Sequence, residues 1–177
     1  YQNVKELISR GKIEIVPNFV KKEFIVNDID VKKLDKIRII FLSNLIKSKG
    51  TLELLEAVKQ LHKKGIKFVL NVAGNFYSSE IKTEFTKTKE ILGNKFIYHG
   101  FLKGKQKRDI LVKSNLFVLP TYYPNEAQPI SILEAMGSGN VVITTRNGGI
   151  PDIIKEKKNG FFVEEKSSES IVKTIEK

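Results

Sequence analysis

The chain has 177 residues, 41% hydrophobic and 29% charged, which is typical of one globular domain with a single core and excludes a disordered chain. It contains no cysteine, which excludes disulfide scaffolds, thiolate metal sites and cysteine nucleophiles. The lysines behind the net charge of +11 are spread along the chain without interleaved aromatic residues, so we predict a solvated surface and no nucleic-acid partner.

The first 36 residues lack the periodicity of the remainder. In chain order we expect a short helix, a short strand and a charged irregular stretch in residues 4–9, 13–16 and 20–36. The chain also begins at Tyr1 rather than at a methionine, as a piece of a longer protein would. We interpret residues 1–36 as a leading segment that follows a preceding domain, and residues 37–177 as the domain itself.

From residue 37 onward, predicted strands and helices alternate. Short apolar runs predict buried strands in residues 37–43, 66–73, 96–99, 116–119, 141–144 and 161–163. Helical spacing predicts helices in residues 51–64, 79–92, 105–114, 129–136 and 151–155, and from residue 167 to the chain end. This alternation is typical of a parallel sheet covered on both faces, so we predict an α/β, Rossmann-like fold with about six strands.

Ligands of such sheets bind at the carboxyl ends of the strands, in the loops that lead into helices. Four loops of this kind are candidates, at residues 43–51, 74–79, 100–105 and 120–129. No dinucleotide-binding or P-loop glycine pattern occurs in the first of them. The two histidines, His62 and His99, lie too far apart in sequence to predict a metal site.

The segment PTYYPNEAQPISILEAMG, residues 120–137, is the most informative of these regions. Pro129 suits the first position of a helix, which would leave the backbone N–H groups of Ile130, Ser131 and Ile132 free at the positive end of the helix dipole. Such an arrangement can bind a diphosphate.

Two glutamates flank this helix start. Glu134 lies on nearly the same helix face as Ile130, and its carboxylate, leaning toward the amino end, suits the paired hydroxyls of a ribose. Glu126 precedes the helix and could accept hydrogen bonds from sugar hydroxyls. Both could instead be solvated surface residues, but an idle charge is unexpected at Glu134, among the apolar residues Ile132, Leu133, Ala135 and Met136.

The segment from Glu126 to Gly137, EAQPISILEAMG, resembles the E-x7-E signature of the retaining family-4 glycosyltransferases (glycosyl transferases group 1). Several ordered motifs at plausible spacing are more specific than any one of them. The other segments that resemble this family are Val16-Pro17-Asn18, Lys47 to Gly50, Tyr98 to Leu102, Asn147 to Asp152 and Asn159-Gly160.

The resemblance implies a GT-B fold of two Rossmann-like domains, of which this chain would be the C-terminal, donor-binding half. The reaction would transfer a sugar from a nucleoside diphosphate to an acceptor hydroxyl with retention of configuration, in polysaccharide or glycolipid synthesis. It would need no metal. The acceptor, a saccharide or a lipid-linked group, would bind to the missing N-terminal domain, so the chain alone would be inactive. The absence of cysteine favours a cytoplasmic setting, and the domain could contact the inner face of the membrane.

By the same resemblance, Glu126 would contact the transferred sugar and Glu134 the ribose. Lys49 would be the phosphate lysine, a cation where charge builds up on the departing diphosphate. The backbone of Gln128, Pro129, Ile130 and Ser131 would hold the diphosphate. The remaining donor-binding residues would be Asn44, Lys47, Gly74, Phe101 and Leu102.

One position departs from the family pattern. The family has Gly-Arg at the end of the first strand, where this chain has Ser43-Asn44. An asparagine lacks the charge and the forked donors of an arginine. Either Asn44 binds the phosphate while Lys47 or Lys49 supplies the charge, or the handling of the donor is altered.

Two other classes of function remain open. The chain could belong to a nucleotide-sugar epimerase of the same fold, or be a non-catalytic nucleotide-sugar-binding module, which the missing arginine favours. The base of the donor also stays open between UDP, GDP and ADP.

Overall fold

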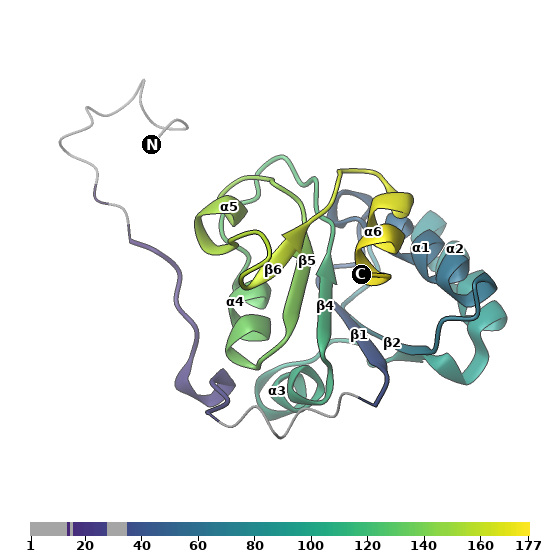
Figure 1. The fold of residues 1–177 in the computed structure, drawn as a ribbon, viewed down its shortest axis with the longest axis horizontal. Coiled ribbons are helices and arrows are strands. Elements are labelled where there is room, and N and C mark those ends of the chain that lie inside the picture. Colours follow the sequence, from purple (N-terminus) through teal and green to yellow (C-terminus); the bar gives the residue numbers. More distant parts are fainter. Residues whose placement is uncertain (1–13, 15, 28–34) are drawn as a thin grey trace.

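The computed structural model describes residue 14, residues 16–27 and residues 35–177. These residues form one six-stranded parallel sheet with the order β3-β2-β1-β4-β5-β6 (Figure 1). The strands are β1 Ile37–Leu42, β2 Phe68–Ala73, β3 Phe96–Tyr98, β4 Leu116–Leu119, β5 Val141–Thr144 and β6 Gly160–Phe162. The helices are α1 Thr51–Lys63, α2 Ser79–Leu92, α3 Gly104–Lys113, α4 Ile130–Gly137, α5 Ile150–Ile153 and α6 Ser168–Ile175. The predicted α/β fold is confirmed.

All strands and helices predicted from residue 37 onward are present, with small differences in their bounds. The second strand begins at Phe68 rather than at residue 66, because the amide of Ile66 donates to the carbonyl of Leu61 at 3.1 Å, just beyond the end of α1, and does not pair within the sheet. Pro129 is the N-cap of α4 and not its first helical residue, since its ψ of 118° lies outside the helical range.

The central strand β1 shows why a continuous apolar run forms the middle of the sheet. Ile39, Ile40 and Phe41 are fully buried. Strands β2 and β4 pair with β1 on its two sides, and helices cover both faces, so successive side chains on either face meet apolar neighbours. Burying a side chain of this size stabilises the fold by about 1.5–3 kcal/mol.

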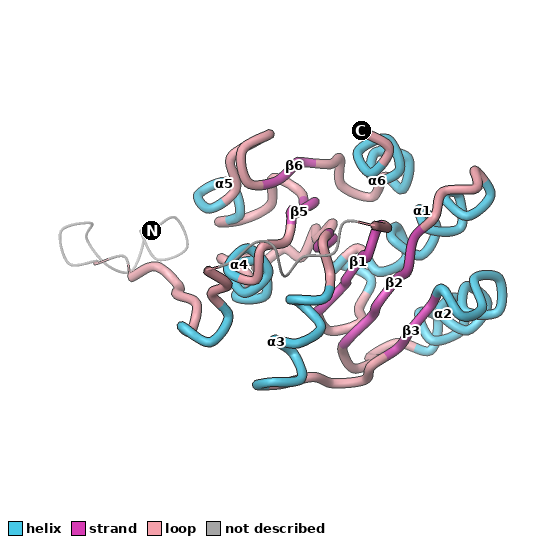
Figure 2. Tube along the Cα trace, turned by 60° about the horizontal axis from the view of Figure 1, so that its bottom comes forward, coloured by secondary structure: helices cyan, strands magenta, loops and turns pink. Residues whose placement is uncertain are grey.

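The helices form one layer on each face of the sheet (Figures 1 and 2). Helices α1, α2 and α6 cover one face, where α1 packs against both α2 and α6. Helices α3, α4 and α5 cover the other face, where α3 contacts α4. In α1 the apolar residues at helical spacing turn inward, and Leu54, Leu55, Ala57, Val58 and Leu61 are buried.

The described part of the leading segment packs against the domain beside α4 (Figure 1). A short 3-10 helix, Lys22–Phe24, buries Phe24 in the hydrophobic core, and the hydroxyl of Ser138 donates to the Phe24 carbonyl at 3.2 Å. Upstream, Phe19 is 80% exposed. Most of the helix and strand predicted in residues 4–9 and 13–16 lies outside the described residues. The domain division at residue 36 stays a prediction.

The strand order reverses between β1 and β4, so the connections after these two strands diverge and leave a crevice at their carboxyl ends. Two of the four candidate loops, at residues 43–51 and 120–129, leave the sheet at this point. The fold therefore brings the segments with the predicted lysines and glutamates to one edge of the sheet.

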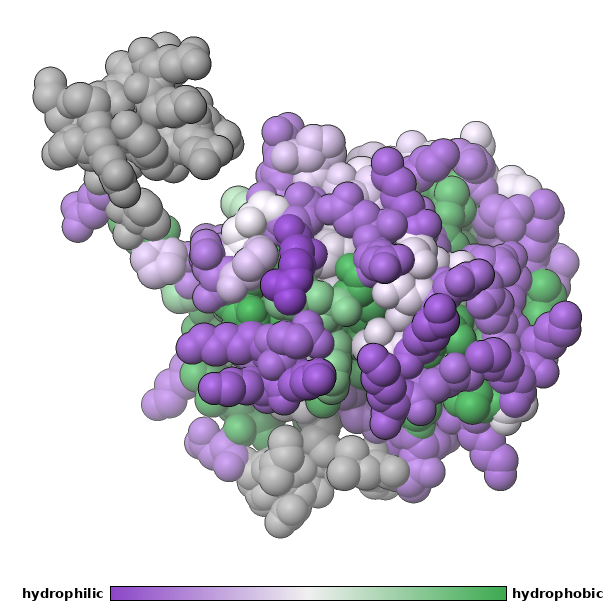
Figure 3. All heavy atoms as spheres, turned by 45° about the horizontal axis from the view of Figure 1, so that its top comes forward, coloured by the Kyte–Doolittle hydropathy of each residue, from purple (hydrophilic) through white to green (hydrophobic). Residues whose placement is uncertain are grey.

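Hydrophilic side chains cover most of the face shown in Figure 3, with hydrophobic residues visible between them. This surface is what 31 lysine and arginine residues in a chain of this length produce. Within residues 16–27 and 35–177, no helix is long and apolar enough to cross a membrane.

Candidate functional site

The loops after β1 and β4 lie against each other at the point where the strand order reverses. The amide of Tyr122 donates to the carbonyl of Ser48 at 2.8 Å, which joins the two loops directly. Gly50 has a φ of +74°, and a Cβ atom there would lie 2.3 Å from the carbonyl oxygen of Pro120. Only glycine permits both this backbone conformation and this close approach.

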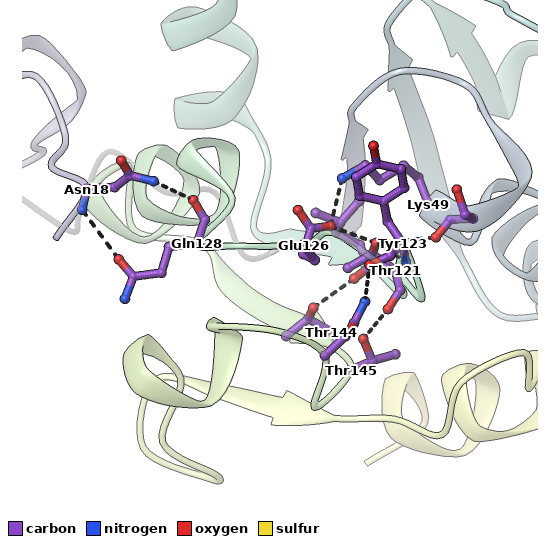
Figure 4. A network of polar contacts seen from close by, with 11 residues as sticks. Asn18, Lys49, Thr121, Tyr123, Glu126, Gln128, Thr144 and Thr145 are labelled. Carbon is purple, nitrogen blue, oxygen red and sulfur yellow. Dashed lines mark hydrogen bonds and ion pairs between the residues drawn. The ribbon is translucent and has the colours of Figure 1, made fainter. Parts of the chain in front are cut away.

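Lys49 and Glu126 form an ion pair between these loops (Figure 4). The distance from Lys49 Nζ to Glu126 Oε2 is 2.7 Å, and their side chains are 15% and 7% exposed. The hydroxyl of Thr121 donates to the same oxygen at 2.7 Å. Lys49 Nζ also lies 4.6 Å from the centre of the Tyr123 ring. The two residues predicted to be catalytic are therefore in direct contact.

A second set of contacts fixes the loop that carries Glu126 (Figure 4). The hydroxyl of Thr145 donates to the carbonyl of Thr121, and Asn147 Nδ2 donates to the carbonyl of Tyr123 at 2.8 Å. Gly148 has a φ of +53°, and a Cβ atom there would lie 1.8 Å from the carbonyl oxygen of Glu126. The segment after β5 thus supports the backbone of Glu126.

Glu134 is paired with a lysine from a different element. It is 6% exposed, in the middle of α4, and its Oε1 lies 2.5 Å from Nζ of Lys107 in α3. Sequence reasoning missed Lys107, because it is one of four lysines between residues 103 and 113, KGKQKRDILVK, and has the appearance of a solvated side chain. Each of the two predicted glutamates is therefore paired with a half-buried lysine.

The amino end of α4 differs from its prediction in the number of free amides as well as in the place of Pro129. The amide of Ile132 is not free, because it donates to the carbonyl of Pro129 at 3.0 Å in a tight first turn. The amides of Ile130 and Ser131 have no hydrogen-bond acceptor in the described part of the chain. Two backbone donors, rather than three, are thus available at the positive end of the helix.

Gln128, which precedes the N-cap of this helix, is held by the leading segment (Figure 4). Asn18 Nδ2 donates to the backbone carbonyl of Gln128 at 2.8 Å, and the amide of Asn18 donates to Oε1 of Gln128 at 3.4 Å. The Val16-Pro17-Asn18 motif singled out in the sequence therefore contacts the amino end of α4.

A cavity of about 200 Å³ lies at the carboxyl ends of β1 and β2. Gly74 is part of its lining, with a φ of +145°, and a Cβ atom there would lie 1.8 Å from the Ser43 carbonyl oxygen. The cavity joins four of the predicted donor-binding residues to two lysines of the following segment. These lining residues are Asn44, Gly74, Phe101, Leu102, Lys103 and Lys107.

Some of the residues at this site are joined to others by ion pairs, whereas other predicted site residues have no side-chain partner among the residues that the structure describes. Lys107 links the cavity to Glu134, and Lys49 links the loop after β1 to Glu126. Lys47 is exposed, and its side chain makes no ion pair or hydrogen bond within the described residues. Asn44 is likewise exposed, at the rim of the cavity.

Neither histidine belongs to this candidate site. His99 Nε2 lies 2.9 Å from Oδ1 of Asn71, and burial lowers the pKa of His99. His62 Nδ1 lies 3.3 Å from Nζ of Lys95. Among the residues described, no three histidine, aspartate or glutamate side chains gather as metal ligands would.

The chain is similar in sequence to known proteins. The family model "Glycosyl transferases group 1" matches residues 24–177. One subunit of the human phosphatidylinositol N-acetylglucosaminyltransferase is 28% identical over 167 residues, which cover 93% of this chain and 33% of that protein. The chain spans about a third of the length of several curated relatives that it matches.

Solved structures share the fold. The C-terminal domain of a glycosyl transferase group 1 family protein (LpcC) from Francisella tularensis is 28% identical, with a TM-score of 0.67 over 79% of this chain and 73% of that one. Sucrose-phosphate synthase from Thermosynechococcus elongatus is 18% identical, with a TM-score of 0.81 over 99% of this chain and 45% of that one. The Rossmann-like α/β fold thus matches that of GT-B glycosyltransferases, and the chain belongs to the glycosyl transferases group 1 family.

Proposed function

We propose that this chain is the donor-binding domain of a retaining glycosyltransferase. The observation that carries this proposal is the convergence of Glu126, Glu134 and the amino end of α4 at the point where the strand order reverses. Ligands of open α/β sheets bind at this point. A solved relative that is itself a C-terminal domain agrees with this position in the whole enzyme.

In this proposal the diphosphate of the donor binds to the free amides of Ile130 and Ser131. Two N–H groups at the positive end of a helix dipole favour an anion. Glu134 accepts hydrogen bonds from the ribose, and the nucleoside occupies the cavity beside Gly74 and Phe101. The sugar lies next to Glu126, in reach of the loop after β4.

Lys49 has the electrostatic role. Its ammonium group is held at Glu126 and near the ring of Tyr123, between the two loops that flank the crevice. Negative charge develops on the diphosphate as its bond to the sugar breaks, and a fixed cation stabilises that charge without a metal. Asn44 and the exposed Lys47 complete the phosphate contacts in place of the family's arginine.

The acceptor binds to a further domain in this proposal. Several relatives are more than twice as long as this chain, and a site formed between two domains is incomplete in one of them. We therefore propose binding of a nucleotide sugar without turnover by the chain alone. The human relative is named for phosphatidylinositol, which agrees with a lipid-linked acceptor. A saccharide acceptor and a place at the cytoplasmic face of a membrane remain part of the proposal.

Calorimetric titration of the 177-residue chain with UDP, GDP and ADP tests this function. We expect saturable binding of one nucleotide with a dissociation constant of about 1 mM or lower. Glu134→Ala is expected to weaken that binding about tenfold, since the ribose loses its charged acceptor. Glu90→Ala, at an exposed position of α2, is the matched control and should bind like the wild type.

Two results would contradict the proposal: no binding of any of the three nucleotides, or unchanged binding by Glu134→Ala. Binding of a nucleotide sugar followed by conversion of the sugar without an acceptor would instead identify an epimerase. Asn44→Arg tests the place of Asn44 beside the diphosphate, because a restored arginine adds affinity only where a phosphate binds.

A further inference from the structure

The pair between Lys107 and Glu134 is more deeply set than a surface salt bridge. The Glu134 side chain is 8% exposed and the Lys107 side chain 20%, and the two atoms in contact lie 2.5 Å apart. A carboxylate removed from water must find its hydrogen bonds within the protein. Lys107 is the partner that the described residues provide for it.

Two further contacts restrict where the Lys107 ammonium can lie. Its Nζ is 5.2 Å from the centre of the Phe24 ring, which is itself 2% exposed. The next residue, Arg108, donates from Nε to the carbonyl of Glu23 at 2.6 Å and so ties α3 to the leading segment. The aromatic face and this backbone contact hold α3 and its lysine in one position relative to α4.

Only one carboxylate oxygen of Glu134 is engaged in this pair. Oε1 receives the hydrogen bond from Lys107, whereas Oε2 receives none within the described part of the chain. Lys107 also lines the cavity at the carboxyl ends of β1 and β2. The pair thus connects the cavity to the Glu134 carboxylate, whose oxygen Oε2 is free to accept a hydrogen bond.

We propose that Lys107 is a positioning residue for the donor site. It holds Oε1 of Glu134 so that Oε2 accepts a hydrogen bond from a ribose hydroxyl, and it thereby sets the preference for ribonucleotides over 2′-deoxyribonucleotides. This inference rests on the proposed function, because it assigns the ribose to Glu134. Lys107 acts here through the glutamate and makes no contact of its own with the phosphates.

The test is a double-mutant cycle of Lys107→Met and Glu134→Gln, measured by calorimetry. The ligands are whichever of UDP, GDP and ADP the wild type binds best and its 2′-deoxy analogue. We expect a wild-type preference for the ribonucleotide of about tenfold, the size of a hydrogen bond to a charged group. Lys107→Met should weaken ribonucleotide binding about tenfold and reduce the preference to less than about twofold. In the Glu134→Gln background, Lys107→Met should change the affinity by less than about twofold.

Two control variants show whether the effect of Lys107→Met is specific to this residue. A melting experiment shows whether the variants are folded. Lys107→Arg keeps a cation beside Glu134 and should retain the preference for the ribonucleotide. Lys105 is exposed in the same helix, does not line the cavity and forms no ion pair in the described residues, so Lys105→Met should leave the preference unchanged. Thermal melting of each variant shows that it is folded at the temperature of the titration.

Equal weakening of the ribonucleotide and its 2′-deoxy analogue by Lys107→Met would overturn the inference. The inference would also be overturned if Lys107→Met weakened ribonucleotide binding as much in the Glu134→Gln background as in the wild type. That result would indicate that Lys107 contacts the phosphates directly. Absence of binding by the wild type would instead contradict the proposed function, so the two failures are distinguishable.

Discussion

Lys47 and Lys49 lie two residues apart in one 3-10 helix, Lys47–Lys49, yet their surroundings differ greatly. Lys47 is exposed, and no ion pair to it exists in the described part of the chain. Lys49 is 15% exposed in its side chain and contacts both Glu126 and Tyr123. An ion pair in water contributes little to stability, whereas removing one partner of a buried pair leaves an uncompensated charge.

This contrast gives a prediction for two matched variants. Lys49→Met should lower the free energy of unfolding by about 2–3 kcal/mol, because Glu126 then keeps only the hydroxyl of Thr121 as a partner. Lys47→Met should change it by less than about 0.5 kcal/mol. Urea denaturation measures both, and equal effects of the two changes would contradict the assigned geometry.

The sequence predicts some of these residues better than others. Glu126, Glu134 and Lys49 could be proposed as candidates because they occupy motif positions beside strand ends and a helix start. Lys107 could not, because its pairing with Glu134 depends on the packing of α3 against α4, which periodicity does not specify. Thr121 could not be predicted either. No sequence pattern distinguishes a threonine whose hydroxyl donates to Glu126 from any other threonine at a strand end.

At the scale of elements, the alternation of strands and helices could be predicted almost completely from residue 37 onward. Each element has a continuous apolar run or an apolar stripe, and glycines or prolines bound many of them. Two details required the structure. Because the Ile66 amide donates to Leu61 in α1, the second strand begins two residues later than predicted. Because the Ile132 amide donates to Pro129 in the tight first turn of α4, it is not a free donor.

The leading segment provides a second prediction at this scale. Phe24 is 2% exposed and belongs to the core, so Phe24→Ala should lower the free energy of unfolding by about 3 kcal/mol or more. Phe19 is 80% exposed, and the same change there should have an effect within about 0.5 kcal/mol. Thermal or urea unfolding compares the two variants. A small effect of Phe24→Ala would mean that the leading segment is not part of the folded domain.

At the scale of the whole molecule, the strand order determines where function can lie. Strands β1 and β4 are adjacent in the sheet, although β2, β3 and the helices α1, α2 and α3 lie between them in the sequence. The alternating pattern predicts a parallel sheet, and the resemblance to a family predicts its type. The pairing of Lys107 with Glu134 across α3 and α4 follows only from the assembled fold.

The most direct test of the central claim is a crystal structure of this chain with whichever of UDP, GDP and ADP it binds best. We predict the diphosphate within hydrogen-bond distance of the Ile130 and Ser131 amides and the ribose at Oε2 of Glu134. The nucleoside should occupy the cavity lined by Gly74 and Phe101. A nucleotide bound elsewhere, such as the hollow beside Lys157 and Lys158 near the start of β5, would contradict the assignment of the site.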